Sequence, residues 1–389
     1  MGQGRQMARR AAAAEQMHLG GPNGAELRHR LRLIRSRRVG AVTFHRLVSE
    51  HGSAAAALAA LPDIARAAGV EGYSPCPPEV VDHELTQGRL AGAVLLAHDG
   101  PGYPDGMRDL PDAPPLLWAR GDVALLSRPM VAMVGARNAS SLGLRMARRL
   151  AETLGEAGQV VVSGLARGID TESHRAALAT GTVAVMAGGV DVVYPEENAA
   201  LMAEVAARGC VISEQPMGLV PQARHFPLRN RIIAGLSRAV VVVEAAARSG
   251  SLITAREALD MGREVMAVPG HPFDARAAGC NHLIRDGATL VRGAPDVLEV
   301  LGVQTPRQGE EGEVDDRPPL PGPVPARRPL ADVARLHGLI LNRLGPSPTA
   351  EDQLIRDLGV SAAEVTPELV TLELEGKIQR APGGMLSRL

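Results

Sequence analysis

The segment 130–164, MVAMVGARNASSLGLRMARRLAETLGEAGQVVVSG, contains the pattern on which the fold depends. It begins and ends with the short runs MVAMVG and VVVSG, which are apolar at nearly every position. Strands that are buried on both faces have this composition. The amphipathic helix GLRMARRLAETLGEAG lies between the two runs. The segment therefore predicts a strand–helix–strand unit of a parallel sheet with helices on each side.

The same alternation extends over residues 93–303. Further apolar runs occur at AVLLA, PLLWA, VAVMAGG, CVISE, AVVVVEA, EVMAVPG and TLVRG, and helical stretches such as LITAREALDMG lie between them. Repeated strand–helix units predict an α/β core with a Rossmann-like, doubly wound and mostly parallel sheet. Ligands of such sheets bind beyond the carboxyl ends of the strands, so the loops that follow the strands are the candidate sites.

Four other segments differ from the core in composition. Residues 24–92 contain short helical stretches broken by Gly and Pro, which predicts a small all-α domain; a helix-hairpin-helix arrangement is compatible with them. Residues 304–329 are acidic and then rich in proline, which predicts a flexible linker. Residues 330–389 contain three helical stretches and two short strands around Pro-Gly-Gly, the order of a winged helix. Residues 1–23 are basic without an apolar core, which predicts a disordered leader and not a secretory signal.

The composition limits the kinds of partner. The chain has 389 residues and a formal net charge of -1, so any site for a polyanion must be a local patch. Lys377 is the one lysine, and anion contacts in the core must therefore come from arginines, whose planar guanidinium groups suit phosphate. Cys76, Cys210 and Cys280 lie far apart, which predicts reduced, buried thiols in a cytoplasmic protein without a metal site. No stretch reaches the ~20 apolar residues that span a membrane.

The loop MVGARNASSLG follows a strand and opens a helix. Gly135 allows a tight turn, Arg137 is at the tip, and Asn138, Ser140 and Ser141 can cap the helix or donate to an anion. The spacing is not GxGxxG, and no acidic residue follows the next strand to hold a ribose, which argues against a dinucleotide site. An ordinary helix cap with a surface arginine is the alternative.

The loop VVSGLARGIDTESHR has the same design after the next strand. Ser163, Gly164 and Gly168 precede Asp170 at the start of a helix. Asp170 and His174 resemble a catalytic pair, but no nucleophile stands beside them in a GxSxG elbow. We therefore expect structural roles, in which Asp170 caps the helix and His174 satisfies a neighbouring loop.

The loop VVVEAAARSGSLITAREAL follows a third strand. Glu244 lies at the strand end, and Ser249, Gly250 and Ser251 lead into a helix, an arrangement whose backbone N–H groups bind anions. It lacks the lysine of a Walker A loop, and GxxxxGK[ST] occurs nowhere in the chain. An ATPase is therefore not expected.

The stretch HFPLRNRIIAGLSR concentrates positive charge in a nearly neutral chain. Pro227 favours an extended residue before it, with a helix continuing through RNRIIAGLSR. Arg229 and Arg231 then fall in or near the first turn, where a cation opposes the helix dipole, so an external anion explains them better. Salt bridges to acidic residues elsewhere are the alternative, and at least one of the two is expected to be structural, because alternate helical residues face different sides. Phe226 can stack one base.

Six motifs together resemble one known family. GARNASSLG, SGLARGID, AGGVDVVYP, SEQPMG, FPLRNRIIAGLS and EAAARSGSLITA occur in the order and spacing of the bacterial DNA-processing protein A family (DprA, also called Smf). The resemblance implies a SAM-like helical domain before the Rossmann-like core and a winged-helix domain after it. It implies a protein that binds single-stranded DNA, protects incoming DNA during natural transformation, loads the RecA recombinase and forms homodimers through the core. It implies neither catalysis nor a cofactor.

The resemblance also assigns the site. Arg137 matches the family's G-x-R loop, and arginines such as Arg167 or Arg224 are expected to replace pocket lysines that this chain lacks. Phosphates would be held by arginines and helix N-termini, so binding should be largely independent of sequence and weaken with salt. The predicted DNA-binding residues are Gly135, Arg137, Asn138, Ser163, Gly164, Arg167, Gly168, Arg224, Phe226, Arg229, Asn230, Arg231, Ser249, Gly250 and Ser251, with Asp170, His174 and Glu244 as structural neighbours.

Two other functions stay open. The core also resembles the lysine-decarboxylase-like nucleoside-monophosphate phosphoribohydrolases, although EAAARSGSLITA lacks their glycine run and catalytic Glu. The second open function is that of a nucleotide-binding regulatory module.

In the winged helix, SAAEVTPELVTLELEG carries Glu364, Glu368, Glu373 and Glu375 and no arginine, so we expect a structural or protein-binding role and not duplex binding.

Overall fold

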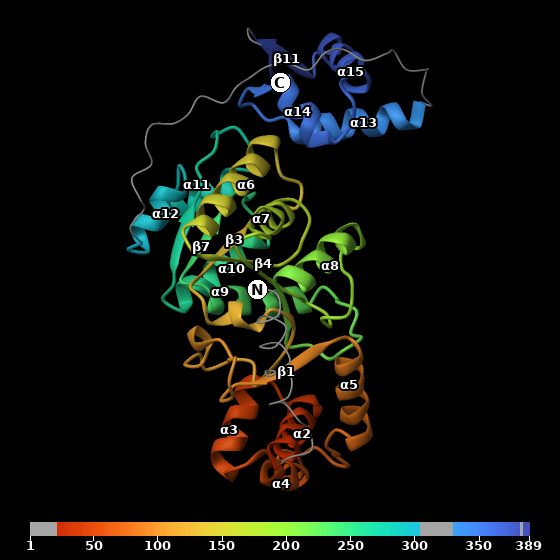
Figure 1. Ribbon diagram of the computed structural model, residues 1–389, viewed down its shortest axis with the longest axis vertical. Coiled ribbons are helices and arrows are strands. Elements are labelled where there is room, and N and C mark those ends of the chain that lie inside the picture. Colours follow the sequence, from red (N-terminus) through yellow and green to blue (C-terminus); the bar gives the residue numbers. More distant parts are fainter. Residues whose placement is uncertain (1–21, 304–329, 382–383) are drawn as a thin grey trace, which may run out of the picture.

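The computed structural model describes residues 22–303, 330–381 and 384–389. The predicted linker, and all but the last two residues of the predicted leader, lie outside them. Figure 1 shows the α/β core between an N-terminal helical domain and a C-terminal winged helix. No helix within the described residues is long and apolar enough to cross a membrane.

The core is built on one nine-stranded sheet, and each apolar run quoted above overlaps one of its strands. The strand order is β1-β2-β6-β5-β4-β3-β7-β8-β9. β2 runs antiparallel to β1 and β6, and the other neighbours are parallel, which confirms the prediction of a mostly parallel sheet. The strands are β1 (Ala93–Ala97), β2 (Leu116–Gly121), β3 (Met130–Val134), β4 (Val160–Ser163), β5 (Thr182–Val185), β6 (Cys210–Ser213), β7 (Ala239–Val242), β8 (Glu264–Ala267) and β9 (Thr289–Leu290).

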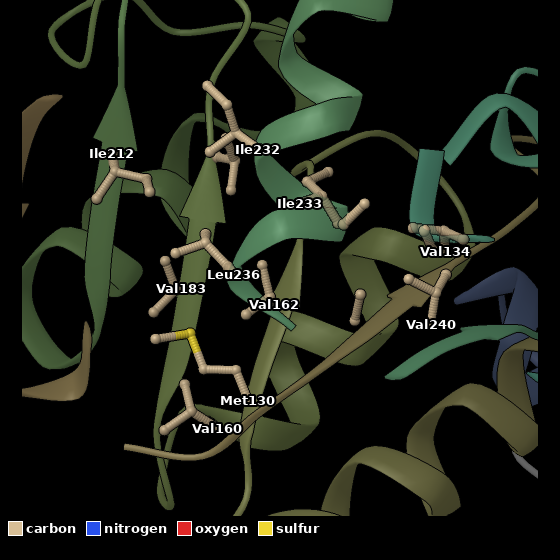
Figure 2. Packing of buried hydrophobic residues seen from close by; sticks show 14 of the residues in the cluster. Met130, Val134, Val160, Val162, Val183, Ile212, Ile232, Ile233, Leu236 and Val240 are labelled. Carbon is tan, nitrogen blue, oxygen red and sulfur yellow. The ribbon is translucent and has the colours of Figure 1, made fainter. Parts of the chain in front are cut away.

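Helices cover both faces of the sheet, which explains why its strands are apolar throughout. Alternate residues of β3 point to opposite faces, so Val134 belongs to one apolar cluster and Met133 to the other. Figure 2 shows the first cluster, to which α9 (His225–Leu236) contributes Ile233. The other core helices are α6 (Ser141–Glu156), α7 (Ile169–Ala177), α8 (Ala199–Arg208), α10 (Ser251–Asp260), α11 (Ala278–Arg285) and α12 (Ala294–Val300), with the short 3-10 helices η1 (Asp105–Met107), η2 (Val123–Ser127) and η3 (Glu196–Asn198).

The direction of the chain across the sheet reverses beside β3. The chain passes from β3 through β4 and β5 to β6 on one side. α9 then carries it back to β7, which pairs with β3 on the other side. Connections therefore leave β3 and β7 in opposite directions, and a crevice is expected at their carboxyl ends.

The N-terminal helical domain has its own apolar cluster, which includes Leu47 and Leu61. A buried contact joins this domain to the core: Trp118 of β2 donates Nε1–H to Glu84 at 2.7 Å, and Arg35 pairs with the same carboxylate at 2.8 Å. The helices are α2 (Pro22–Arg35), α3 (Ala41–His51), α4 (Ala54–Ala67) and α5 (Pro78–Leu90).

The C-terminal domain packs three helices against an antiparallel sheet of order β10-β12-β11. Leu336, Ile340 and Leu369 belong to its apolar cluster. The predicted winged helix is confirmed, with the short strand β10 added to the expected hairpin. Its elements are α13 (Leu330–Arg343), β10 (Thr349–Ala350), α14 (Glu351–Leu358), α15 (Ala362–Leu374), β11 (Ile378–Ala381) and β12 (Met385–Arg388).

Candidate nucleic-acid interface

A groove of about 940 Å³ lies at the carboxyl ends of β3 and β7, where the topology predicts a ligand site. The loop after β3, the first turns of α9 and the loop between β7 and α10 line it. A second groove of about 460 Å³ shares Arg137 and Arg229 with the first. The lining of the first groove includes the arginines Arg137, Arg229, Arg248 and Arg276 and one acidic residue, Asp170.

Arg137 extends from the tip of the loop after β3. Its guanidinium carbon lies 5.3 Å from the centre of the Phe226 ring, a cation–π distance. It is exposed, and it forms no hydrogen bond or ion pair with any other described residue. The turn before it requires glycine, because a Cβ on Gly135 would lie 2.6 Å from Ile169 Cγ1 and 2.9 Å from the Glu244 carbonyl oxygen. The loop is therefore pressed against the core while its tip faces the groove.

Two aromatic rings lie beside this arginine. Phe226, at the start of α9, faces Tyr194 with ring centroids 5.6 Å apart and an interplanar angle of 52°. Tyr194 is 41% exposed and lines both grooves. The sequence analysis assigns base stacking to Phe226 alone and misses Tyr194, although the motif AGGVDVVYP contains it. The rings offer an apolar surface on which planar groups can stack.

Arg229 is a buried cation in the wall of both grooves. Arg229 is 7% exposed, and its Nε has no hydrogen-bond partner among the described residues. Burial lowers the pKa of Arg229 to about 10; the charge of Arg137 lowers it too, and Asp170 opposes the shift. The guanidinium lies over Gly164, where a Cβ would come within 1.2 Å of its Nη1. Gly164, which lines the second groove, therefore makes room for Arg229.

His174 has the structural role expected of it, whereas Asp170 is structural in another way than expected: the N-terminus of α7 has no side-chain cap hydrogen bond, and Asp170 holds the loop before the helix. Asp170 Oδ2 accepts hydrogen bonds from the backbone N–H of Gly164 at 3.1 Å and of Ala166 at 3.3 Å. His174 Nε2 accepts from the Leu165 N–H at 3.3 Å. Burial raises the pKa of Asp170 and lowers the pKa of His174 to about 3, so the imidazole is neutral. Both side chains thus fix the loop SGLARGID through hydrogen bonds to its backbone.

The helix N-termini at the groove differ in what occupies them. At α6, Ser140 Oγ donates to Glu244 Oε2 at 2.6 Å and the Ser140 N–H donates to the same carboxylate at 3.1 Å. The chain's own carboxylate thus fills the position that the sequence analysis leaves for an external anion. At α10, Ser249 and Gly250 line the groove, and no acidic residue lies in the first turn. The α10 terminus is therefore the open one.

Two of the predicted arginines lie outside both grooves. Arg231 donates Nη1–H to the Asp112 carbonyl oxygen at 2.9 Å and Nη2–H to Glu214 Oε2 at 2.5 Å. Arg224 is exposed before α9, and its Nε–H donates to His225 Nε2 at 3.3 Å. Neither residue lines the two grooves, so a DNA contact of Arg224 stays a prediction, and Arg231 has the structural role expected of at least one arginine of the motif. Arg231 braces the fold, because acidic and carbonyl oxygens from two distant segments surround it.

Ser163 and Gly168 support the loops and do not line either groove. Ser163 is buried and donates to a carbonyl oxygen of β3 at 2.6 Å. Gly168 has a φ of +77°, and a Cβ there would lie 2.2 Å from the Ala136 carbonyl oxygen, so glycine allows the two loops to touch. Arg167 lines only the second groove, 3.6 Å from Glu197.

Arg248 is a groove residue that the sequence analysis misses. It is exposed in the loop before α10 and has no ion pair with the rest of the described chain. Its position directly before Ser249-Gly250-Ser251 is the signal that could have identified it. Asn138 and Asn230 also line the groove, the latter with Nδ2 3.4 Å from the Gly250 carbonyl oxygen.

Comparisons with known proteins agree with this architecture. The family model of the DNA recombination-mediator protein A matches residues 94–302, that of the DprA-like N-terminal HHH domain matches 24–86, and that of the DprA winged helix domain matches 324–384. Protein Smf of Synechocystis sp. is 35% identical over 312 residues, which cover 74% of this chain and 78% of the relative. DNA processing protein DprA of Bacillus subtilis is 42% identical over 235 residues, 60% of this chain and 78% of the relative.

Two solved structures share the fold. DNA processing protein A from Streptococcus pneumoniae aligns with a TM-score of 0.57 and 37% identity, covering 67% of this chain and 98% of that one. The protein of the same name from Helicobacter pylori, described for its single-stranded DNA binding mode, aligns with a TM-score of 0.50 and 28% identity over 54% of this chain and 95% of that one. This chain therefore belongs to the DNA recombination-mediator protein A family, also called DprA or Smf.

Proposed function

We propose that this protein binds single-stranded DNA in the groove between β3 and β7, with little dependence on base sequence. The charge of the groove carries the proposal. Arg137, Arg229 and Arg248 line it, and none of the three has a hydrogen bond or an ion pair with another described residue. Arginines without a hydrogen bond or ion pair are available to phosphate, whereas arginines in salt bridges are not; on Arg229, Asp170 acts only as a nearby charge.

The geometry suggests how a strand would lie. Phosphates would meet Arg137, Arg248 and the open N-terminus of α10, while a base stacks on Phe226 and Tyr194. In the free protein Arg137 lies over the Phe226 ring. A base that stacks on that face displaces the guanidinium, which then turns to the neighbouring phosphate. Because stacking and phosphate contacts are common to all four bases, they carry no sequence preference.

The relatives extend the proposal beyond binding. DprA proteins of Streptococcus and Bacillus are named as DNA processing proteins, and the Helicobacter protein is described as binding single-stranded DNA. We infer that this chain likewise protects incoming DNA in the cytoplasm during natural transformation, loads RecA onto it and works as a homodimer, without a catalytic step or a cofactor.

The test of strand binding is a salt titration of labelled oligo-dT with the wild type, Arg137→Ala and Arg208→Ala. Arg208 is exposed at the end of α8 and lines neither groove, so it controls for the loss of one charge. Arg137→Ala should weaken binding and reduce the slope of log K against log salt by about 0.7, one phosphate contact on a single strand. An unchanged slope and affinity would show that Arg137 does not contact the strand.

The wider roles have separate tests. Sedimentation at several concentrations measures dimerisation, and the strand-dependent ATPase of RecA, with and without this protein, measures loading. Release of free base from AMP would instead support the phosphoribohydrolase alternative. The position of Glu244 argues against that alternative, because its carboxylate is buried and accepts hydrogen bonds from Ser140.

A further inference from the structure

The winged helix touches the core at the end of α13. Arg276, on the loop after β8, donates Nη1–H to the Asn342 carbonyl oxygen at 2.7 Å and Nη2–H to the Leu344 carbonyl oxygen at 3.0 Å. The last carbonyl groups of a helix have no partner within the helix, and the C-terminal end carries partial negative charge. A guanidinium is therefore a favourable cap for this helix end. Asp274 holds Arg276 in place, with Nε–H donated at 3.1 Å.

The residue between these two carbonyls makes the reciprocal contact. Arg343, the last residue of α13, donates Nη1–H to the Ala139 carbonyl oxygen at 2.8 Å. Ala139 is buried in the loop after β3, two residues beyond Arg137. Three consecutive residues of the winged helix, 342 to 344, thus form hydrogen bonds with two of the loops beside the groove at the carboxyl ends of β3 and β7.

A closed circuit of polar contacts results. Ser140, next to Ala139, donates to Glu244, and Arg276 Nε lies 3.8 Å from the Glu244 carboxylate. The tip formed by Arg137 and Asn138 has no hydrogen bond to another described residue, so its position depends on how its two flanks are held. One flank is fixed by the Ile169 N–H, which donates to the Ala136 carbonyl oxygen at 3.2 Å. The other flank, Ala139-Ser140, is held by Glu244 of the core and by Arg343 of the winged helix.

We propose that docking of the winged helix positions the loop that carries Arg137, and that Arg343 is a positioning residue for strand binding. The groove stays open while the winged helix is docked, so the domain braces the site and does not block it. Thermodynamic linkage makes the two effects equal: the factor by which docking of the winged helix increases the affinity for single-stranded DNA is the factor by which bound DNA favours docking. The effect on DNA rests on the proposed function, but the effect on the loop does not.

The test compares Arg343→Ala with Arg335→Ala in the full chain. Both residues lie on α13, but Arg335 is exposed and pairs at 3.9 Å with Asp332 of the same helix. Arg343→Ala should weaken oligo-dT binding roughly three- to tenfold, the effect of one lost hydrogen bond. The salt slope should stay at the wild-type value, because no phosphate contact is lost. Arg335→Ala should behave as the wild type, and Arg343→Lys, which keeps one donor, should recover part of the affinity.

Hydrogen exchange of the free protein gives a readout that needs no DNA. In Arg343→Ala the amides of residues 136–140 should exchange faster than in the wild type, while those of β3 and β4 do not change. Equal effects of the two alanine variants, a reduced salt slope for Arg343→Ala, or faster exchange throughout the core would each overturn the proposal. If the wild type failed to bind oligo-dT, the proposed function would fall, and the exchange of residues 136–140 would still decide whether the winged helix braces the loop.

Discussion

Arg229 and Arg231 lie two residues apart on α9, and the surroundings of their charges are opposite. Arg231 is held by Glu214 and Asp112, at 2.5 Å and 3.5 Å. Arg229 is buried with no ion pair among the described residues, and its Nε has no partner. A step of two residues turns an α-helix by about 200°, so one residue faces the groove and the other the opposite side.

The difference shows how a fold can separate structural from functional charge within one motif. Burying a cation without a partner raises the free energy of the folded protein, whereas a buried pair is stable only as long as both partners remain. Arg231 therefore belongs to the fold. The buried charge of Arg229 has an electrostatic cost that an incoming phosphate would relieve. We therefore assign Arg229 to DNA binding and Arg231 to the stability of the fold.

The largest expected effect is on stability and comes from Arg231→Met. The substitution keeps the apolar part of the side chain but removes the hydrogen-bonded cation of the mostly buried Glu214 carboxylate. Loss of one partner of a buried pair costs about 3 kcal/mol or more, so the urea midpoint should fall clearly. Glu214→Gln in the same background should restore part of that loss, because it removes the isolated charge. A change below about 1 kcal/mol would mean that Arg231 does not brace the fold.

The next effect is on binding and comes from Arg229→Met. Loss of a charge-assisted contact should weaken oligo-dT binding roughly tenfold or more and lower the salt slope by about 0.7. Its unfolding free energy should change less than that of Arg231→Met, because no hydrogen-bonded ion pair is broken, although Asp170 loses the charge that most favours its ionised form. The matched pair of Arg→Met variants thus separates the two faces of α9. Should Arg231→Met reduce the salt slope and Arg229→Met leave it unchanged, the assignment would be reversed.

The fold was predictable because its signals are local. Runs such as MVAMVG and VVVSG are apolar because both faces of their strands are covered, and the loops between strand and helix follow from the same pattern. The helical periodicity of α9 also predicts that Arg229 and Arg231 cannot serve the same groove. These inferences need only neighbours in sequence.

The errors concern contacts between distant segments. Glu244 accepts hydrogen bonds from Ser140, the N-cap residue of α6, from 104 residues away, so the loop after β3 alone gives no sign that its anion site is filled. Arg231 finds Asp112 at a separation of 119 residues. Arg248 and Tyr194 join the groove only once the sheet has brought their loops together. Which charges are neutralised is therefore a property of the tertiary structure.

The last expected effect, which is small near neutral pH and grows as the pH falls, concerns the groups behind Arg229. Burial, with a smaller contribution from the charge of Arg229, lowers the pKa of His174 to about 3. In the unfolded chain the imidazole takes up a proton below about pH 6.5, so from there down to about pH 3 the unfolded state binds more protons. Stability should then fall as the pH falls, by up to about 1.4 kcal/mol per pH unit, and His174→Gln should remove this slope.

The same titration distinguishes the two arginines once more. Arg229→Met removes a positive charge near His174, so the pKa of His174 should rise and the acid-sensitive window should narrow from its lower end. Arg231→Met should leave the contribution of His174 unchanged. Urea unfolding at several pH values, with each arginine variant measured both with and without His174→Gln, isolates this contribution from those of Asp170 and Glu214, whose pKa values burial raises. If both arginine variants changed the His174 contribution equally, the charge of Arg231 would act on His174 as strongly as that of Arg229. The opposite faces of α9 would then not separate the electrostatic effects of the two arginines.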